Sequence, residues 1–99
     1  RAGAAIIPAG VPVVLVEGNY LLLDREPWTR LAPLFDLKIF IDVPLAELER
    51  RLLARWAGHG REPAAARAWV ERNDLPNARL VLAESRPADI VWRNHGRIA

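Results

Sequence analysis

The most informative stretch of this chain is Val13-Val14-Leu15-Val16-Glu17-Gly18-Asn19-Tyr20. Four apolar residues, three of them β-branched, run directly into an acid that is followed by a glycine. An apolar run without alternation is typical of a strand covered on both faces, as in a parallel sheet. We therefore predict a strand over Val13–Glu17, which places the Glu17 carboxylate at the edge where ligands of open α/β sheets gather.

Two later segments of the chain have the same strand-like character. They are Leu37–Val43, which carries Asp42 near its carboxyl end, and Ala88–Trp92. Helical patterns separate the predicted strands along the chain. Strands that alternate with helices predict an α/β fold in which parallel strands are joined by right-handed crossovers.

Prolines mark where the first two predicted helices begin. Pro27 opens a short helix over Trp28–Leu34, because proline is tolerated in a first helical turn. Pro44 begins a longer helix, which Gly58-His59-Gly60 ends. The apolar residues of this longer helix recur at helical spacing, at Leu45, Leu48, Leu52 and Trp56.

A third helical segment opens at Pro63 and is predicted to run to about Asn73. Pro76 cannot lie deep inside a helix, because it lacks an N–H group and collides with the preceding turn. We therefore predict a kink or restart at Asp74, whose side chain would cap a further helix over Leu75–Glu84.

Composition sets broad limits on the class of protein. The chain has 99 residues, room for one domain, and a hydrophobic share of 52%, which agrees with elements covered on more than one side. Its formal charge is +2, without the long basic run and interleaved aromatics that favour nucleic-acid binding. It has no cysteine, no apolar run long enough to span a bilayer and no recognisable signal peptide. A cytoplasmic protein without nucleic-acid or membrane partners is the expectation.

Glu17 is the first candidate for chemistry. Its carboxylate could hold water on a magnesium ion or accept a proton from a substrate hydroxyl. The alternative is a strand-end acid that caps neighbouring backbone. Tyr20, shortly after it, could stack on a substrate ring, although an aromatic after a strand is more often part of the core.

Basic residues suggest a second candidate site. Arg51 and Arg55 lie four residues apart and share a helix face, where like charges repel by roughly 0.2–0.5 kcal/mol. A polyphosphate would offset this cost, because guanidinium groups bind phosphate oxygens bidentately. The alternative is that Glu47, four residues before Arg51, pairs with it. Arg61 follows two glycines, which suits either a mobile flap over a ligand or an ordinary connection between helices.

For several polar and aromatic residues the sequence leaves alternative roles open. Asn73 and Asn77 fall on an otherwise apolar helix stripe, where they either cap the break at Pro76 or face a site. The four tryptophans are most simply core or interface residues; they are Trp28, Trp56, Trp69 and Trp92.

Taken together, these segments closely resemble the uridine kinase and phosphoribulokinase family of P-loop kinases. Within it they are most similar to the bacterial nucleoside/nucleotide-kinase-like proteins, some of which are called fructose-transport kinases. The resemblance extends from about Pro12 to Trp92 and rests on the order and spacing of several strings. These are Val-Glu-Gly-Asn-Tyr-Leu-Leu-Leu at 16–23, Phe-Ile-Asp-Val-Pro at 40–44, Arg-Leu-Leu-Ala-Arg at 51–55, Asn-Asp-Leu-Pro-Asn-Ala at 73–78 and Ala88-Asp89.

The resemblance implies a three-layer α/β fold of the P-loop type and transfer of the γ-phosphoryl group of ATP, with Mg²⁺, to a small-molecule hydroxyl. Glu17 would match the family's acid near the magnesium and the substrate, and Asn19 and Tyr20 would lie near the acceptor. Arg51, Arg55 and Arg61 would match the arginines of a lid that closes over the phosphates, with Arg55 also catalytic. The acceptor, a nucleoside or a sugar, is not specified, and a homodimer is left open.

The sequence departs from the family in one respect. It contains no G-x-x-x-x-G-K-[ST] loop, the motif that cradles nucleotide phosphates. We therefore expect residues 1–99 to be the C-terminal part of a single kinase domain, inactive alone and with an unpaired sheet edge where the central P-loop strand would lie. Two other hypotheses stay open: a non-catalytic binding or interaction module derived from a P-loop kinase, and, with little support, a basic nucleic-acid-binding domain.

Overall fold

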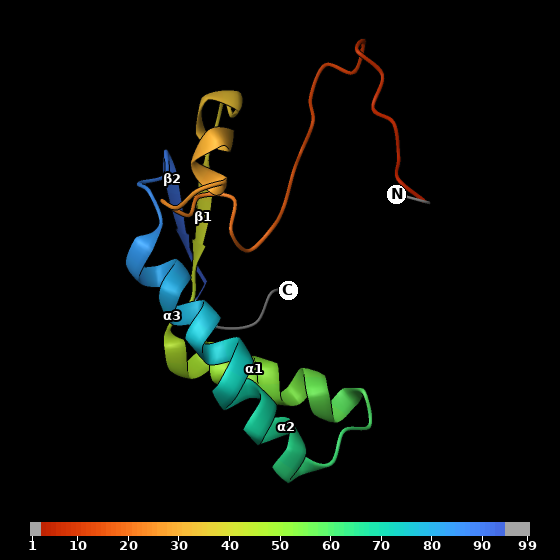
Figure 1. Cartoon of the computed structure of the whole chain (residues 1–99), viewed down its shortest axis with the longest axis vertical. Helices are drawn as coiled ribbons and strands as arrows, with labels where there is room; N and C mark the ends of the chain where they lie inside the picture. Colours follow the sequence, from red (N-terminus) through yellow and green to blue (C-terminus); the bar gives the residue numbers. More distant parts are fainter. Residues whose placement is uncertain (1–2, 95–99) are drawn as a thin grey trace.

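The computed structural model describes residues 3–94 of the chain. Figure 1 shows three parts: an N-terminal arm (residues 3–19), a small sheet beside a short helix, and a group of packed helices. The elements in chain order are the 3-10 helix η1 (Trp28–Leu34), β1 (Ile39–Asp42), α1 (Leu45–Gly58), α2 (Pro63–Trp69), the π-helical turn η2 (Val70–Asp74), α3 (Leu75–Glu84) and β2 (Ile90–Arg93).

The sheet consists of β1 and β2, which pair in parallel with Ile39 opposite Ile90. A parallel pair needs a long crossover, and the helices between the two strands supply it. The structure thus confirms the strands predicted over 37–43 and 88–92, each as a four-residue strand. It also confirms the predicted α/β class with parallel strands.

Backbone and side-chain hydrogen bonds fix both ends of the strand pair. At the start, the Asp89 carboxylate accepts a hydrogen bond from the Lys38 amide at 2.8 Å, and the Asp89 amide donates to the Lys38 carbonyl at 2.9 Å. At the end, the Asn94 amide donates to the Asp42 carbonyl at 2.8 Å. These bonds hold the register by which the carboxyl ends of both strands lie together.

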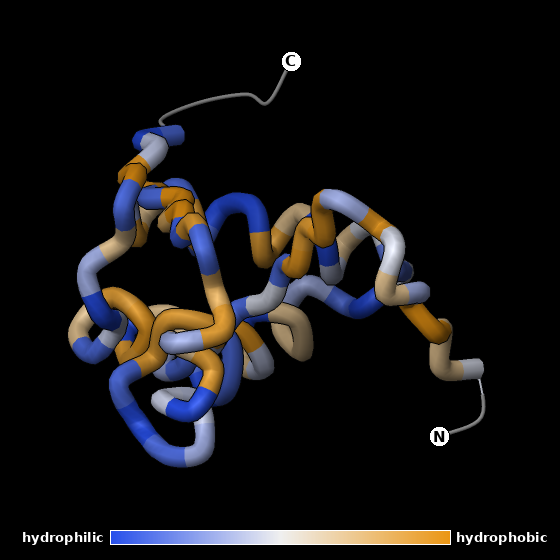
Figure 2. Tube along the Cα trace, turned by 90° about the horizontal axis from the view of Figure 1, so that it is seen from above, coloured by the Kyte–Doolittle hydropathy of each residue, from blue (hydrophilic) through white to orange (hydrophobic). Residues whose placement is uncertain are grey.

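The strand predicted over Val13–Glu17 does not form. This segment belongs to the arm, which runs away from the sheet and the helices in Figure 1. The side chains of Val13 and Leu15 are 80% and 91% exposed. The physical reason is that a strand gains its hydrogen bonds from a neighbouring strand, and the arm lies beside neither β1 nor β2. Figure 2 shows hydrophobic stretches along this exposed arm.

α1 forms where the leucine periodicity predicts it, directly after Pro44. Glu47 lies in its first turn, where a negative charge interacts favourably with the helix dipole. At the other end the His59 amide donates to the Arg55 carbonyl at 3.1 Å. Gly60 has φ +76°, a left-handed conformation that glycine adopts at low cost, so the helix ends as predicted.

The helix predicted from Pro63 to about Asn73 begins there as α2, but the α-helix ends at Trp69 and continues as the π-helical η2. Its cap is Glu62, whose carboxylate accepts hydrogen bonds from the Ala64 and Ala65 amides at 3.2 and 3.1 Å. Such a side chain satisfies amide donors that have no partner inside a first helical turn. The helix predicted over Leu75–Glu84 is confirmed as α3.

The break predicted at Asp74 takes a different form. Asp74 has helical dihedral angles and caps no amide, so the capping role predicted for it is wrong. Instead, α2 and α3 are joined by η2, in which the Leu75 amide donates to the Val70 carbonyl five residues earlier. A wide turn of this kind accommodates Pro76, which lacks the N–H for a regular helical bond.

The buried core is small and lies where the helices meet. α1 packs against α2, η2 and α3. Because η2 contacts α1, α2 and α3, it is the centre of the helical group. Both faces of the short sheet stay largely open at β2, where Val91 and Trp92 point to opposite faces and are 52% and 64% exposed. Among the described residues, those less than one-tenth exposed are Leu23, Val43, Ala66, Val70 and Leu75.

The segment that follows the arm is tied to the end of α3. Leu23 and Ser85 form an isolated antiparallel bridge, and the Asp24 amide donates to the Glu84 carbonyl at 2.8 Å. The Arg25 guanidinium makes two hydrogen bonds to the Glu84 carboxylate, at 2.7 and 2.8 Å. The chain is therefore anchored from about residue 22 onwards, and the arm is what precedes this anchor.

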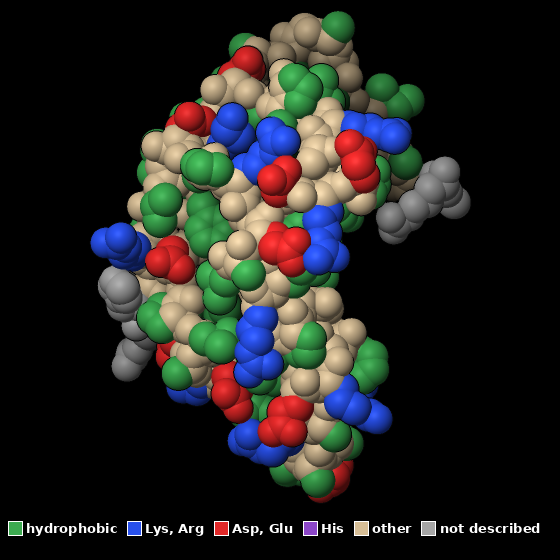
Figure 3. All heavy atoms as spheres, turned by 60° about the vertical axis from the view of Figure 1, so that its left-hand side comes forward, with side chains coloured by type: hydrophobic (Ala, Val, Ile, Leu, Met, Phe, Trp, Pro, Cys, Tyr) green, Lys and Arg blue, Asp and Glu red, His purple; other side chains and the backbone are tan. Residues whose placement is uncertain are grey.

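Charges of both signs are interspersed over the face of the molecule shown in Figure 3. Many of them form ion pairs, such as Arg86 with Asp24 and Arg67 with Glu49. No helix within residues 3–94 is both long and apolar enough to cross a membrane.

Candidate functional site

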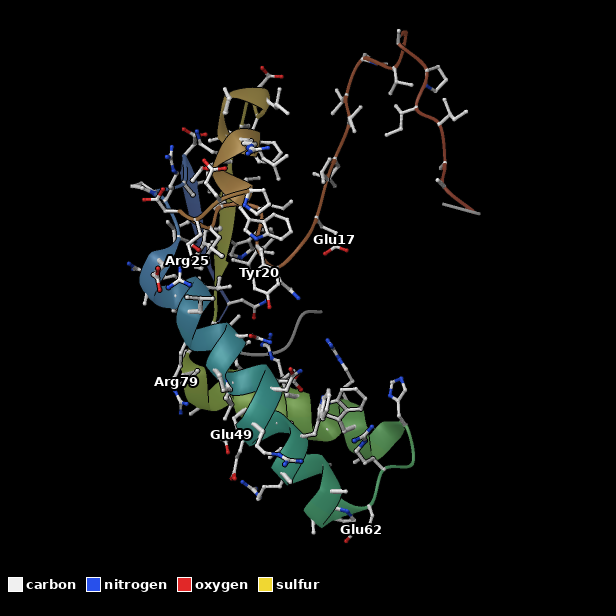
Figure 4. The ribbon with its side chains drawn as sticks, in the orientation of Figure 1. Glu17, Tyr20, Arg25, Glu49, Glu62 and Arg79 are labelled. Atoms are coloured by element: carbon white, nitrogen blue, oxygen red, sulfur yellow. The ribbon has the colours of Figure 1, made fainter. Side chains whose placement is uncertain are left out.

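Glu17, the acid predicted to take part in catalysis, lies on the arm. Glu17 is exposed and stands apart from the helices in Figure 4. Since residues 13–17 form no strand, the structure does not bring Glu17 to the carboxyl ends of β1 and β2. Asn19 is likewise exposed, so this part of the predicted site is not assembled by the described residues.

Tyr20 is the point at which the arm joins the rest of the protein. It is half-buried, and its ring lies 5.6 Å from the Trp28 ring at an angle of 42°. This contact is the core-like packing that was the alternative for Tyr20. It leaves open whether Tyr20 also faces an acceptor.

A pocket of about 340 Å³ lies beside this aromatic pair, and sequence reasoning did not find it. Its wall joins the segment after the arm to η1 and to the connection before β2, and no pattern in the sequence indicates that these three segments meet. None of the predicted site residues lines it. The lining residues are Leu21, Leu22, Leu23, Asp24, Trp28, Ala32, Lys38, Arg86 and Pro87.

Arg51 lies on α1, and Glu47 and Asn94 are among its partners. Its Nε donates to Glu47 Oε1 at 3.0 Å, which confirms the pairing considered from the sequence. A second nitrogen donates to Asn94 Oδ1 at 3.1 Å, directly after β2. Arg51 therefore connects the first half of α1 to the end of the sheet, a contact that spacing along the helix could not reveal.

The Glu47 carboxylate carries the clearest electrostatic perturbation in the structure. Hydrogen bonds from Arg50, at 2.6 and 2.9 Å, and then from Arg51 lower the pKa of Glu47 to about 2. The hydrogen bonds favour the charged carboxylate and outweigh the smaller opposing effect of desolvation. Glu47 therefore stays ionised and keeps both guanidinium groups in place.

Arg55 lies one turn beyond Arg51 on α1, with its side chain exposed. Its backbone carbonyl accepts the His59 amide and lies 2.8 Å from His59 Nδ1. The end of α1 is therefore well ordered, whereas the Arg55 guanidinium faces solvent. A solvent-facing cation near a helix end is available to an incoming anion.

Arg61 is held by two aromatic rings. The carbon of its guanidinium lies 4.8 Å from the centre of the Trp56 ring and 5.6 Å from that of Trp69. The two indoles meet edge to face, with centroids 6.3 Å apart and planes at 83°. Sequence reasoning assigned these tryptophans to core or interface and missed the cluster, because it forms only when α1 and α2 fold back on each other.

The cluster continues into η2. The Trp56 indole nitrogen donates to Asp74 Oδ2 at 2.8 Å, and the Asn73 amide donates to Asp74 Oδ1 at 3.0 Å. Asn73 and Asn77 are both half-buried. Because the Asn73 side chain donates to Asp74, it contacts this carboxylate rather than a free helix end. We call the four residues Trp56, Arg61, Trp69 and Asp74 the Arg61 cluster.

The chemistry of the predicted site can be compared with that of magnesium. Mg²⁺ is commonly bound through one or two carboxylates, together with waters and substrate phosphates. A single carboxylate such as Glu17 fits that pattern if a nucleotide supplies further oxygens. No group of three or more acidic, histidine or cysteine residues that could hold a metal by itself is found in residues 3–94.

Comparisons with known proteins point to kinases. The chain is 44% identical over 80 residues to the uncharacterised protein YggC of Escherichia coli, covering 81% of this chain and 34% of that protein. It is 33% identical over 95 residues to the ATP-dependent kinase-like protein notR' of Aspergillus versicolor, covering 88% and 54%. A protein of Schizosaccharomyces pombe named as a candidate uridine kinase is 32% identical over 83 residues, covering 80% and 34%.

The similar solved structures also carry names that refer to kinases. A protein of Silicibacter sp. TM1040, named as a candidate fructose transport system kinase, superposes with a TM-score of 0.72 and 47% identity, covering 76% of this chain and 36% of that one. YFH7 of Saccharomyces cerevisiae, named as a candidate P-loop kinase with a circular permutation, gives a TM-score of 0.58 at 24% identity, covering 80% and 26%. The latter likeness concerns the fold alone.

No family model matches the chain. The chain spans between about a third and a half of the length of the curated relatives that it matches. Two of these relatives and one solved structure nevertheless carry names that refer to kinases, and a second solved structure shares the fold. The chain is thus similar in sequence to part of relatives named as kinase-like, and its α/β fold matches part of solved P-loop kinase structures.

Proposed function

We propose that these 99 residues are the C-terminal, lid-bearing part of an ATP-dependent kinase that phosphorylates a hydroxyl of a nucleoside or a sugar. The observation that carries this proposal is the 47% identity, at a TM-score of 0.72, to a protein named as a candidate fructose transport system kinase. The remaining half of the domain would supply the phosphate loop, so the 99-residue chain alone would be inactive. Its use of ATP favours a cytoplasmic location.

In this proposal the arginines of α1 and of the loop after it bind the phosphates. Arg51, Arg55 and Arg61 lie within eleven positions of the chain, on one helix and the connection that follows it. Phosphoryl transfer depends mostly on positioning and on neutralising charge on the transferred group, which guanidinium groups do well. Closing such a lid would also exclude water from the reaction.

Glu17 would act on the other side of the transferred phosphoryl group. Its carboxylate would hold water on a magnesium ion or accept the proton of the acceptor hydroxyl, and a bound Mg²⁺ would supply charge neutralisation. Asn19 and Tyr20 would contact the acceptor. For this, residues 13–17 must form the predicted strand, which requires a neighbouring strand from the other half of the domain.

The first test is the coding region upstream of Arg1. A strand followed by G-x-x-x-x-G-K-[ST] within roughly a hundred residues, about half of a usual domain, supports the proposal. A start codon next to Arg1 with no phosphate loop before it contradicts catalysis. That result would favour the second candidate, a non-catalytic interaction module, for which the exposed strands β1 and β2 provide a surface.

The second test uses the complete protein and two substitutions. Glu17→Gln keeps the size of the side chain and removes its charge, so we expect turnover to fall about 10²–10⁴-fold, the usual contribution of a proton-transfer group. Arg55→Gln should raise the KM for ATP. The matched controls are Glu26→Gln and Arg30→Gln, which break an exposed ion pair of the η1 region. Wild-type turnover in Glu17→Gln would contradict the role assigned to Glu17, and a wild-type KM for ATP in Arg55→Gln would contradict the role assigned to Arg55.

A further inference from the structure

The Arg61 guanidinium lies at the elbow between α1 and α2. The face of the Trp56 ring supports it at 4.8 Å, and Trp69 contributes from the other helix at 5.6 Å. A cation–π contact uses the flat face of the guanidinium or the ring, whereas the N–H donors of arginine point outward in the plane of the group. The contact therefore orients Arg61 without consuming the donors that would bind phosphate.

The Trp56 ring is itself held from outside the elbow. Its Nε1–H donates to Asp74 at 2.8 Å, across eighteen positions of sequence. The second oxygen of the Asp74 carboxylate accepts from Asn73 at 3.0 Å, so the carboxylate is fixed at both oxygens. An indole anchored through its nitrogen cannot turn its face away from Arg61 without breaking a hydrogen bond that involves a charged group.

The anchor stands on the best-packed part of the molecule. Asp74 is the last residue of η2, which contains Val70, fully buried, and is followed by Leu75, 4% exposed. A π-helical turn is uncommon, and such turns often occur at functional sites. Asn73 and Asp74 thus form hydrogen bonds that hold the Trp56 ring, which their positions in the sequence did not indicate.

We propose that Asp74 and Trp56 are positioning residues for Arg61. They fix the direction in which Arg61 presents its donors to the phosphates of ATP, and neither touches the nucleotide. The inference rests on the proposed function through the phosphate-binding role of Arg61. The link between Asp74 and Trp56 can be measured independently of that role.

The link is tested in the complete protein by recording the indole N–H resonances of ¹⁵N-labelled protein without ligand. Trp56→Phe identifies the Trp56 signal. Asp74→Leu removes the acceptor, so we expect that signal to move upfield and its hydrogen exchange to accelerate. Asp74→Asn keeps an acceptor oxygen and should leave the signal close to its original place. Asp36→Leu, at an exposed acid after η1, is the matched control for introducing leucine.

The role of the link is tested by ATP affinity with the same variants. Trp56→Phe and Asp74→Leu should each weaken ATP binding about 2- to 5-fold, the value of an exposed cation–π contact, and the double variant should be no weaker than either. Asp74→Asn should restore most of the affinity. A structural role alone would not produce this non-additivity together with rescue.

Three results would overturn the inference, and the third also contradicts the phosphate-binding role in the proposed function. An unmoved Trp56 resonance in Asp74→Leu contradicts the link itself. A shifted resonance with unchanged ATP affinity, while Arg61→Gln binds ATP more weakly, contradicts the positioning role. If Arg61→Gln binds ATP as well as the wild type, the phosphate-binding role of Arg61 is wrong, and the positioning inference is overturned with it even where the resonance moves.

Discussion

The arm and the helical group α1–η2–α3 are both rich in hydrophobic residues, yet only the second is folded. Val13 to Val16 is an unbroken run of apolar residues, and its side chains are 51% to 91% exposed. In the helical group, Val70 is fully buried. Helices satisfy their backbone hydrogen bonds internally, whereas a strand depends on a neighbour. The difference shows that an apolar run becomes a strand only where a neighbouring strand is present to pair with it.

The largest expected effect concerns hydrogen exchange in the arm. In the 99-residue chain, amides of residues 13–17 should exchange almost as fast as in an unfolded peptide. In a complete kinase domain the same amides should be protected by more than about 1000-fold, because opening a paired strand there costs a large part of the unfolding free energy. Exchange followed by mass spectrometry on both proteins checks this. Strong protection of residues 13–17 in the 99-residue chain would show that the arm folds without further partners.

A smaller effect separates the two regions by stability. Leu75→Ala in the helical core should lower the free energy of unfolding by about 2–5 kcal/mol, since it leaves a cavity at a residue 4% exposed. Leu15→Ala in the arm, where the side chain is 91% exposed, should change it by less than about 0.5 kcal/mol. Urea unfolding curves measure both. Equal losses for the two variants would mean that the arm packs against the protein.

The smallest expected effect is a pH dependence confined to the helical group. The folded pKa of Glu47 is about 2, below its ordinary value of 4.5, so the ionised carboxylate stabilises the folded state. This stabilisation is complete above about pH 4.5 and is lost as the pH falls from 4.5 through 2. Glu47→Gln should therefore lose less stability than the wild type over this range. Thermal unfolding between pH 6 and 2 measures the slope.

The control for this pH experiment again comes from the arm. Glu17→Gln removes the same charge without breaking a contact of α1. If Glu47→Gln follows the same acid curve as the wild type, then the hydrogen bonds from Arg50 and Arg51 do not stabilise the folded state.

Much of the fold could be predicted because its signals are local. Pro44 and the leucine spacing defined α1, and Glu47 could be paired with Arg51 from their separation alone. The break near Pro76 was also foreseen, although not its form, since a capped restart and a π-helical turn both accommodate a proline. The prediction of a strand over 13–17 was wrong for the opposite reason. A strand forms only when it pairs with a neighbouring strand, which residues distant in sequence supply.

The candidate site also has a part that local sequence patterns predict and a part that only packing between elements creates. The sequence by itself determined the α/β class and the helices and strands that follow the arm, because these depend on patterns along one element. The resemblance to P-loop kinases was also visible in the sequence, in the order and spacing of several strings of residues. Only the tertiary structure decided that Arg61 rests on Trp56 and Trp69, that Asp74 anchors Trp56, and that Arg51 reaches Asn94. Those contacts join residues that are distant in sequence, and packing between elements, which no local pattern encodes, brings them together.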